Sequence, residues 1–155
     1  MTRPAFEREW MHEIAPDLWC GRWEAADWIV ATHQPRWAVV CVLEQPRDED
    51  RRPETICRPT LVYRKGAGGR GAPENWVATR DSLDAIADTI DEQLERGNRV
   101  LVHCGIGAER SPMAVAWWLA RTRGFDLDRA YQWVKAMRPG VIDRRDWMAP
   151  ECLTP

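Results

Sequence analysis

Two residues that could act on a phosphate group, Cys104 and Arg110, lie six positions apart in the chain. They follow an apolar run, residues 99–102, that is typical of a buried strand, and they precede an Ala- and Trp-rich stretch that is typical of a helix. A loop between a strand and a helix can turn its backbone N–H groups towards an anion, and the N-terminus of the helix adds its dipole. The pattern therefore predicts a phosphate-binding loop within residues 103–112.

Three side chains of this segment are candidate catalytic residues. Cys104, at a helix start beside Arg110, lies in an environment that favours the nucleophilic thiolate. Arg110 offers a planar fork of donors that can bind two phosphate oxygens and keep them bound as the phosphorus becomes trigonal. Ser111 could donate a hydrogen bond to the sulfur and so help the thiolate to leave when a phosphocysteine is hydrolysed.

The residues between Cys104 and Arg110 are expected to bind the phosphate, together with Arg110, chiefly through their backbone. They are Gly105, Ile106, Gly107, Ala108 and Glu109. Gly105 and Gly107 allow close approach of the backbone to a ligand and permit a positive φ. His103 is expected to orient the loop rather than to transfer protons.

This stretch resembles the signature of the cysteine-dependent protein tyrosine phosphatases, most closely the small, atypical dual-specificity type. The matching residues are His103, Cys104, Gly107, Arg110 and Ser111, directly after an apolar strand. Residues 14–21 resemble the opening strand of that family, and residues 130–139 resemble its penultimate helix. The resemblance covers most of the chain. It implies a phosphomonoester hydrolase with a phosphocysteine intermediate, acting first on protein phosphotyrosine and second on phosphoserine or phosphothreonine.

The chain departs from this family at the general acid. Relatives usually supply the proton from an aspartate in a mobile loop, about thirty residues before the nucleophile. The glycine-rich stretch 65–75 corresponds to that loop in position, but residues 66–73 contain no aspartate. Glu74 is therefore the first candidate, and Glu109 is the second, because it resembles an acidic loop residue of the myotubularin-like lipid phosphatases. Asp81 and Asp143 are weaker candidates.

Other functions remain open at this point. Without a proton donor, the same loop would serve a phosphate-binding pseudophosphatase. With the same chemistry, the substrate could be a phosphoinositide or an RNA 5′-phosphate, although residues 105–109 contain none of the lysines that inositol-lipid phosphatases often carry. The rhodaneses and arsenate reductases fit the Arg-Ser ending and the downstream helices less well.

The composition predicts one catalytic domain over residues 1–155, with residues 1–13 as a loosely held arm. A formal charge of −2 provides no general attraction to nucleic acid or to an anionic membrane, so we expect a phosphorylated protein or another phosphomonoester as partner and no nucleic acid. No apolar signal-peptide core and no membrane-spanning run is present.

The five cysteines form an odd set without Cys-x-x-Cys spacing, which argues against a structural zinc site and against a disulfide framework. A reducing cytoplasm fits this pattern best. We expect no metal and no cofactor.

Hydrophobic periodicity predicts an α/β fold, a three-layer sandwich with a mostly parallel central sheet and helices on both faces. Expected strands lie at residues 17–20, as an edge strand, and at 37–43, 60–63 and 99–102; residues 44–59 are expected to be a solvated loop. Expected helices lie at residues 23–32, 81–95, 113–123, with its start near Ser111 or Pro112, and 130–139. Gly97 and Gly124 end two of these helices, and Asp126 caps the last one.

Overall fold

The computed structural model describes residues 9–66 and 74–154, which fold around a five-stranded sheet with the strand order β1-β2-β7-β3-β4. These strands are β1 (Met11–Ala15), β2 (Leu18–Gly21), β7 (Arg99–His103), β3 (Trp37–Cys41) and β4 (Thr55–Cys57). Strands β2, β7, β3 and β4 are parallel, and β1 pairs antiparallel with β2. The mostly parallel sheet predicted from the sequence is confirmed.

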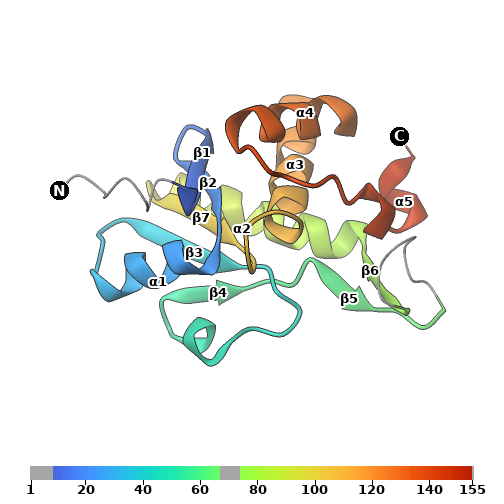
Figure 1. Ribbon diagram of the computed structural model, residues 1–155. Helices are drawn as coiled ribbons and strands as arrows, with labels where there is room; N and C mark the ends of the chain where they lie inside the picture. Colours follow the sequence, from blue (N-terminus) through green and yellow to red (C-terminus); the bar gives the residue numbers. More distant parts are fainter. Residues whose placement is uncertain (1–8, 67–73, 155) are drawn as a thin grey trace.

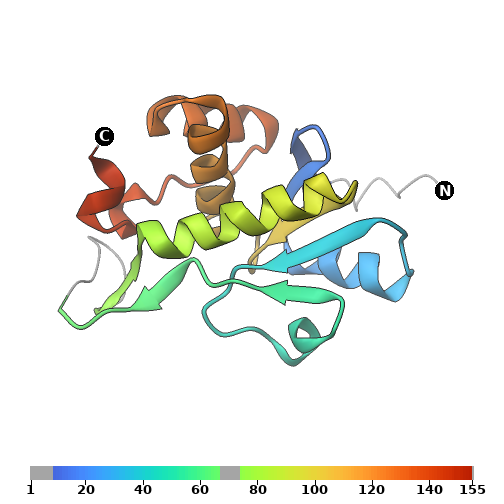
Figure 2. The same cartoon turned by 180° about the vertical axis from the view of Figure 1, so that it is seen from behind.

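Helices cover both faces of this sheet (Figures 1 and 2). Helix α1 (Trp23–Ala31) lies on one face, α2 (Arg80–Glu95) and α3 (Arg110–Arg123) lie on the other, and α4 (Leu127–Met137) packs on α3. The short helix α5 (Pro150–Leu153) ends the described chain. The three-layer α/β sandwich is therefore confirmed.

Each face of the sheet contributes to its own apolar core, because successive side chains of a strand point to opposite faces. Val100 and Val102 of β7 join the larger core with α2, α3 and α4, whereas Leu101 joins the smaller core under α1. Four tryptophans pack at the edge of the smaller core: Trp10, Trp19, Trp28 and Trp37. Packing thus accounts for a good part of the tryptophan content.

The helix boundaries follow the predicted local signals. Asp126 accepts a hydrogen bond from the backbone N–H of Arg129, at 2.8 Å, and so caps α4. Gly97, which follows the C-cap Arg96 of α2, and Gly124, which is the C-cap of α3, take positive φ values of 81° and 68°, where a side chain would be strained. Local sequence alone therefore determines where these helices begin and end.

Three expectations about the chain are wrong in part. The strand at residues 17–20 is not an edge strand, because β1 pairs along its outer side. The loosely held arm does not include residues 11–13, which belong to β1; residues 1–8 lie outside the described part. The solvated loop at residues 44–59 contains the 3-10 helix η2 (Asp48–Arg51) and strand β4. The first two differences arise because β1 forms a hairpin with the adjacent β2, and the third arises in part because β4 pairs with β3.

A second, two-stranded sheet pairs β5 (Leu61–Tyr63) with β6 (Trp76–Ala78) in antiparallel register. It stands beside the N-terminal end of α2, and Ala78 bridges to Met148 in the C-terminal segment. The glycine-rich residues 67–73, for which mobility is expected, lie outside the described residues. Among the helices that are described, none is both long and apolar enough to cross a membrane.

Candidate active site

The predicted phosphate loop leaves the central strand β7 at its carboxyl end and enters α3 at Arg110. In the register of the sheet, His103 at the end of β7 lies between Gly21 of β2 and Cys41 of β3. Because parallel strands end at the same edge, the segments that follow β2 and β3 must pass beside the loop. The loop is therefore built against parts of the chain that are 60 to 80 residues away in sequence.

Four successive carbonyl groups of the loop accept hydrogen bonds from the surrounding protein. Gly105 O accepts from the N–H of Trp23 at 3.0 Å, Ile106 O from Arg138 Nη2 at 3.2 Å, Gly107 O from Arg138 Nε at 2.9 Å, and Ala108 O from the N–H of Ile142 at 2.8 Å. In a trans peptide the C=O of one residue and the N–H of the next residue point in opposite directions. Because the carbonyls of residues 105–108 face these partners, the N–H groups of residues 106–109 turn away from them. Within the described chain, none of these amides donates to a protein acceptor. They form an anion-binding nest at the N-terminus of α3.

Gly107 is required by the close packing beneath this nest. Its φ is +75°, and a Cβ at this position would lie 2.6 Å from Arg138 Nη2 and 2.7 Å from the Gly21 carbonyl oxygen. Gly105 differs, because its φ is not positive and a Cβ there would meet no atom within 4 Å. The predicted positive φ is thus confirmed for Gly107 alone.

The Cys104 thiol lies at the base of the loop and is 3% exposed. Its Sγ is 3.2 Å from the hydroxyl of Ser111, which is itself buried and lies 3.4 Å from the Gly21 carbonyl. A second thiol, Cys20 of β2, donates to the same hydroxyl at 3.5 Å. Burial raises the pKa of Cys20 to about 12, so this thiol stays neutral. The Ser111 hydroxyl, which donates to the Gly21 carbonyl at 3.4 Å, therefore has the Cys104 sulfur as a second and closer partner.

Arg110 is held by a carboxylate that sequence reasoning assigned to a solvated loop. Its Nε and Nη2 donate to the two carboxylate oxygens of Glu44, at 2.7 and 2.6 Å. Glu44 follows β3, which explains its place beside the loop. The Arg110 guanidinium also lies over the ring of Trp147, 5.2 Å from its centroid. These two contacts fix the plane of the guanidinium at the mouth of the nest.

Comparison with known proteins agrees with this geometry. The family model of the dual specificity phosphatase catalytic domain matches residues 73–149, about half of the chain. Protein-tyrosine-phosphatase IBR5 of Arabidopsis thaliana is 49% identical over 80 residues, which are 52% of this chain and 30% of that protein. Dual specificity protein phosphatase 5 of Homo sapiens is 28% identical over 149 residues, which are 90% of this chain and 34% of that protein.

The chain belongs to the dual-specificity phosphatases. It spans about a third of the length of both relatives. The crystal structure of human DUSP28 has the same fold, with a TM-score of 0.65 at 22% identity over 94% of this chain and 89% of that one. The human tyrosine phosphatase-like serine/threonine/tyrosine-interacting protein has a TM-score of 0.66 at 17% identity, over 90% and 91% of the two chains.

The candidate general acids have different surroundings. Glu109 accepts a hydrogen bond from Arg144 Nε at 2.7 Å, and Asp143 is held by Arg145, whose hydrogen bonds outweigh burial and lower the pKa of Asp143. Glu74 is exposed at the border of the undescribed glycine-rich stretch, and no described residue forms an ion pair with it. Asp81 is exposed in the first turn of α2.

Sequence reasoning missed the residues that hold the phosphatase loop in place. Arg138 was seen only as the end of a helix, yet its buried guanidinium binds two loop carbonyls, the Glu9 carbonyl and His12. Glu44, Ile142 and Trp147 also reach the loop from distant segments. Among these residues, only Arg138 has a signal in the sequence, because it belongs to the stretch 130–139 that resembles a helix of the family.

Proposed function

We propose that this protein hydrolyses phosphomonoesters through a phosphocysteine, with protein phosphotyrosine as the first expected substrate and phosphoserine or phosphothreonine as the second. The observation that supports the proposal is the set of four successive carbonyls at residues 105–108 that bond to the surrounding protein, which leaves the loop amides turned away from it and free to bind an anion. The names of the relatives support a protein substrate.

In the proposed reaction, the Cys104 thiolate attacks phosphorus and the ester oxygen leaves with a proton from the general acid. The loop amides and Arg110 stabilise the charge on the equatorial oxygens as the phosphoryl group transfers to sulfur. Water then attacks the phosphocysteine, and phosphate leaves while the sulfur returns to the thiolate. A hydrogen bond from Ser111, 3.2 Å away, stabilises that thiolate.

Glu74 is the proposed proton donor. It is exposed and unpaired among the described residues, whereas the carboxylates next to the loop are each held by an arginine: Glu44 by Arg110, Glu109 by Arg144 and Asp143 by Arg145. A carboxylate that is bound to a guanidinium is not free to turn towards the ester oxygen of a substrate, whereas an unpaired one is. Glu109 is the second candidate.

The same ion pairs support a second function. If Glu74 does not reach the ester oxygen, the described site has a built anion nest without a free carboxylic acid, which suits a phosphate-binding pseudophosphatase. A phosphoinositide or RNA 5′-phosphate substrate would use the same loop. A panel of phosphopeptides, phosphoinositides and 5′-phosphorylated RNA assayed with the purified protein distinguishes these substrates.

The test of the proposed mechanism compares Cys104→Ser and Arg110→Ala with the wild type on p-nitrophenyl phosphate. Each variant should lose activity by about 10²–10⁴-fold while its circular dichroism is unchanged. Cys152→Ser is the matched control, because this thiol is buried outside the site, near the Ala78 carbonyl. Mass spectrometry after acid quenching should find phosphate on Cys104. A Cys104→Ser variant that kept most of its turnover would disprove the phosphocysteine mechanism.

A further inference from the structure

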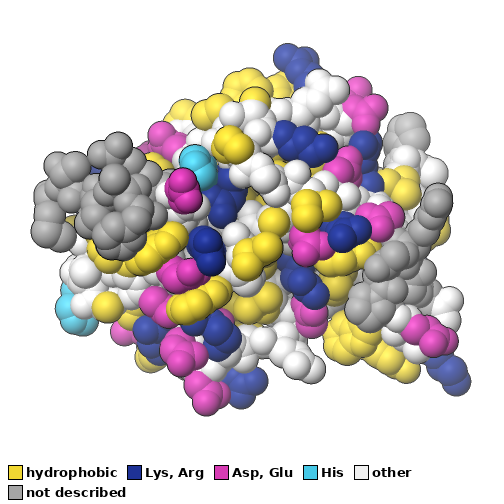
Figure 3. All heavy atoms as spheres, in the orientation of Figure 1, with side chains coloured by type: hydrophobic (Ala, Val, Ile, Leu, Met, Phe, Trp, Pro, Cys, Tyr) yellow, Lys and Arg dark blue, Asp and Glu magenta, His cyan; other side chains and the backbone are white. Residues whose placement is uncertain are grey.

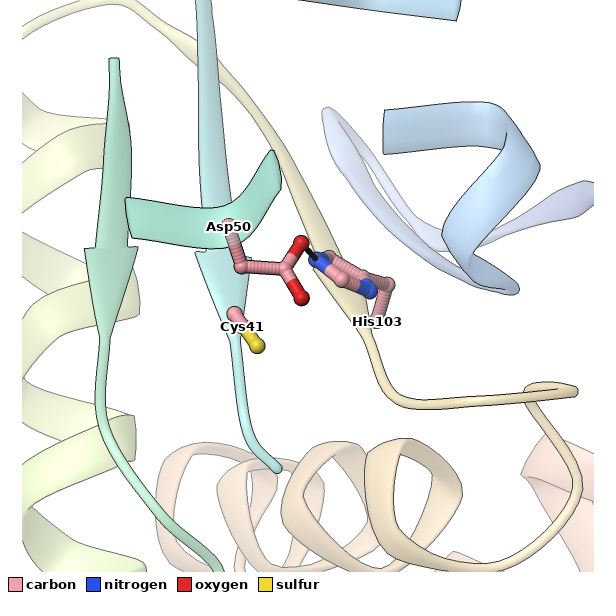
Figure 4. Close-up of side chains that lie close together, drawn as sticks. All are labelled: Cys41, Asp50 and His103. Atoms are coloured by element: carbon pink, nitrogen blue, oxygen red, sulfur yellow. Dashed lines mark ion pairs between the residues drawn. The ribbon is translucent and has the colours of Figure 1, made fainter. Parts of the chain in front are cut away.

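A buried carboxylate lies behind the phosphate loop, in the segment that the sequence predicts to be solvated. Asp50 of η2 is 0% exposed, although its neighbours Asp48 and Glu49 are exposed. Figure 4 shows its carboxylate pointing at the ring of His103, whose Nε2 lies 3.4 Å from Asp50 Oδ1. A fully buried charge is costly unless it is paired, so this placement requires an explanation.

Arg47 holds Asp50 in its ionised form. Its Nη2 donates to Oδ1 at 2.8 Å, its Nε donates to Oδ2 at 3.0 Å, and its backbone N–H donates to Oδ2 at 3.0 Å. Burial by itself would raise the pKa of Asp50, but the nearby His103 ring and the hydrogen bonds from Arg47 outweigh it and hold the pKa well below its ordinary value. Asp50 is therefore a carboxylate throughout the neutral range.

Each ring nitrogen of His103 lies near an oxygen atom. Its Nδ1 forms a hydrogen bond of 3.0 Å with the carbonyl oxygen of Cys104, whereas its buried Nε2 lies 3.4 Å from Asp50 Oδ1 without a formed hydrogen bond. Because neither oxygen carries a hydrogen, a ring that donates to both must be doubly protonated. A doubly protonated imidazole carries a positive charge, and this charge lies one residue from the candidate nucleophile.

The other groups around His103 do not cancel this charge. Cys41 of β3 has its Sγ within 4.8 Å of the His103 and Asp50 ligand atoms, and burial raises the pKa of Cys41 to about 12. Burial also raises the pKa of Cys57, which donates to the Asp50 backbone carbonyl, so both thiols are neutral. Farther out, Asp27 of α1 pairs with Arg47 and Arg52.

Near Cys104 also lie neutral Cys20 and the guanidinium of Arg138, and the charge of Arg138 adds to the positive potential around the thiol.

Cys41, Asp50 and His103 together have the ligand types of a metal site. The Asp50 oxygen nearest His103 is, however, the one that Arg47 Nη2 already binds. A guanidinium therefore occupies the cation's place beside this carboxylate.

We propose that Asp50 is a positioning residue for the nucleophile. Held by Arg47, it keeps His103 as an imidazolium whose buried charge stabilises the Cys104 thiolate and whose Nδ1–H fixes the start of the phosphate loop. This inference rests on the proposed function, because it assigns Asp50 a part in preparing the same nucleophile.

The test uses Asp50→Asn, which preserves size but removes the charge. The rate of Cys104 alkylation by iodoacetamide, followed by mass spectrometry across pH, should fall about tenfold near pH 6 and recover at higher pH. The acidic limb of kcat/KM for p-nitrophenyl phosphate should move to higher pH by a similar amount. Asp48→Asn and Glu49→Gln, exposed on the same 3-10 helix, should leave both profiles unchanged.

A second variant keeps the proposal testable if Asp50→Asn fails to fold. His103→Asn removes the charge but retains a donor, and it should show the same shift in alkylation. In a double-mutant cycle, Asp50→Asn should add no further shift to His103→Asn. A folded Asp50→Asn or His103→Asn protein with the wild-type alkylation profile would overturn the proposal. Alkylation requires no turnover, so an activated Cys104 in a protein without phosphatase activity would refute only the proposed function.

Discussion

At the scale of single residues, arginine–carboxylate pairs dominate the surroundings of the loop. Glu44, Glu109 and Asp143 are each paired with an arginine. The Arg110 and Arg144 guanidinium groups both lie over the Trp147 ring, at 5.2 and 4.8 Å from its centroid. Figure 3 shows acidic and basic side chains intermixed across this face of the molecule. Such pairing engages each of these carboxylates with an arginine, which directs attention to a glutamate without a described ion pair as proton donor.

The first residue-scale prediction concerns Glu74→Gln. Phenyl phosphate has a poor leaving group that needs a proton, whereas p-nitrophenyl phosphate needs little assistance. If Glu74 is the acid, the variant should lose about 10²-fold on phenyl phosphate and far less on p-nitrophenyl phosphate, and its kcat profile should lose the basic limb. Steady-state kinetics across pH measures both effects.

Glu109→Gln is the matched comparison, since it makes the same chemical change within the loop. Its loss should be similar on both substrates, because the change removes the ion pair with Arg144 and no proton donor. If Glu109→Gln instead lost far more rate on phenyl phosphate than on p-nitrophenyl phosphate, Glu109 would be the general acid. Wild-type behaviour of both variants would instead favour the pseudophosphatase.

At the scale of elements, the carboxyl edge of the parallel sheet assembles the site. Segments after β2, β3 and β7 meet there, and the end of α4 closes the base of the loop through Arg138. Burial lowers the pKa of this arginine, yet it stays charged far above neutral pH. One side chain thus ties α4 to the loop and to His12 of β1.

We therefore predict that Arg138→Met destabilises the protein by about 2–4 kcal/mol, because it leaves buried carbonyls without donors. It should also lower kcat/KM, since the carbonyls of Ile106 and Gly107 lose the partner that orients the nest. Urea unfolding and p-nitrophenyl phosphate kinetics measure the two effects. Arg129→Met, exposed on the same helix, should change neither by much. Equal stabilities of the two variants would contradict the structural role of Arg138.

At the scale of the whole molecule, the fold places Cys104 in surroundings that differ from those of the other four cysteines. All five cysteines are free, and burial raises the pKa of the other four, to about 12 for Cys20 and Cys41 and to about 11 for Cys152, with Cys57 also raised. Cys104 alone lies at a helix N-terminus inside an anion nest. We therefore expect the same chemical group to react differently according to its place in the fold.

The corresponding prediction is that iodoacetamide at near-neutral pH modifies Cys104 first, and that vanadate or phosphate slows this modification. Peptide mass spectrometry over a time course gives the order of labelling. Half-buried Cys57 provides the internal control, because it is more accessible than Cys104 but lacks the nest. Faster labelling of Cys57 than of Cys104 would contradict an activated thiolate.

The sequence by itself determined the layers, most helix boundaries and the loop that contains Cys104 and Arg110. These features depend on periodicity, caps and short spacings, which are local properties of the chain. The tertiary structure decided what holds that loop: Arg138 beneath it, Glu44 on Arg110 and Asp50 behind His103. These contacts join residues 31 to 66 positions apart. A charged residue in a polar stretch has the same local pattern whether it is solvated or buried, and only the pairing of distant strands determines which.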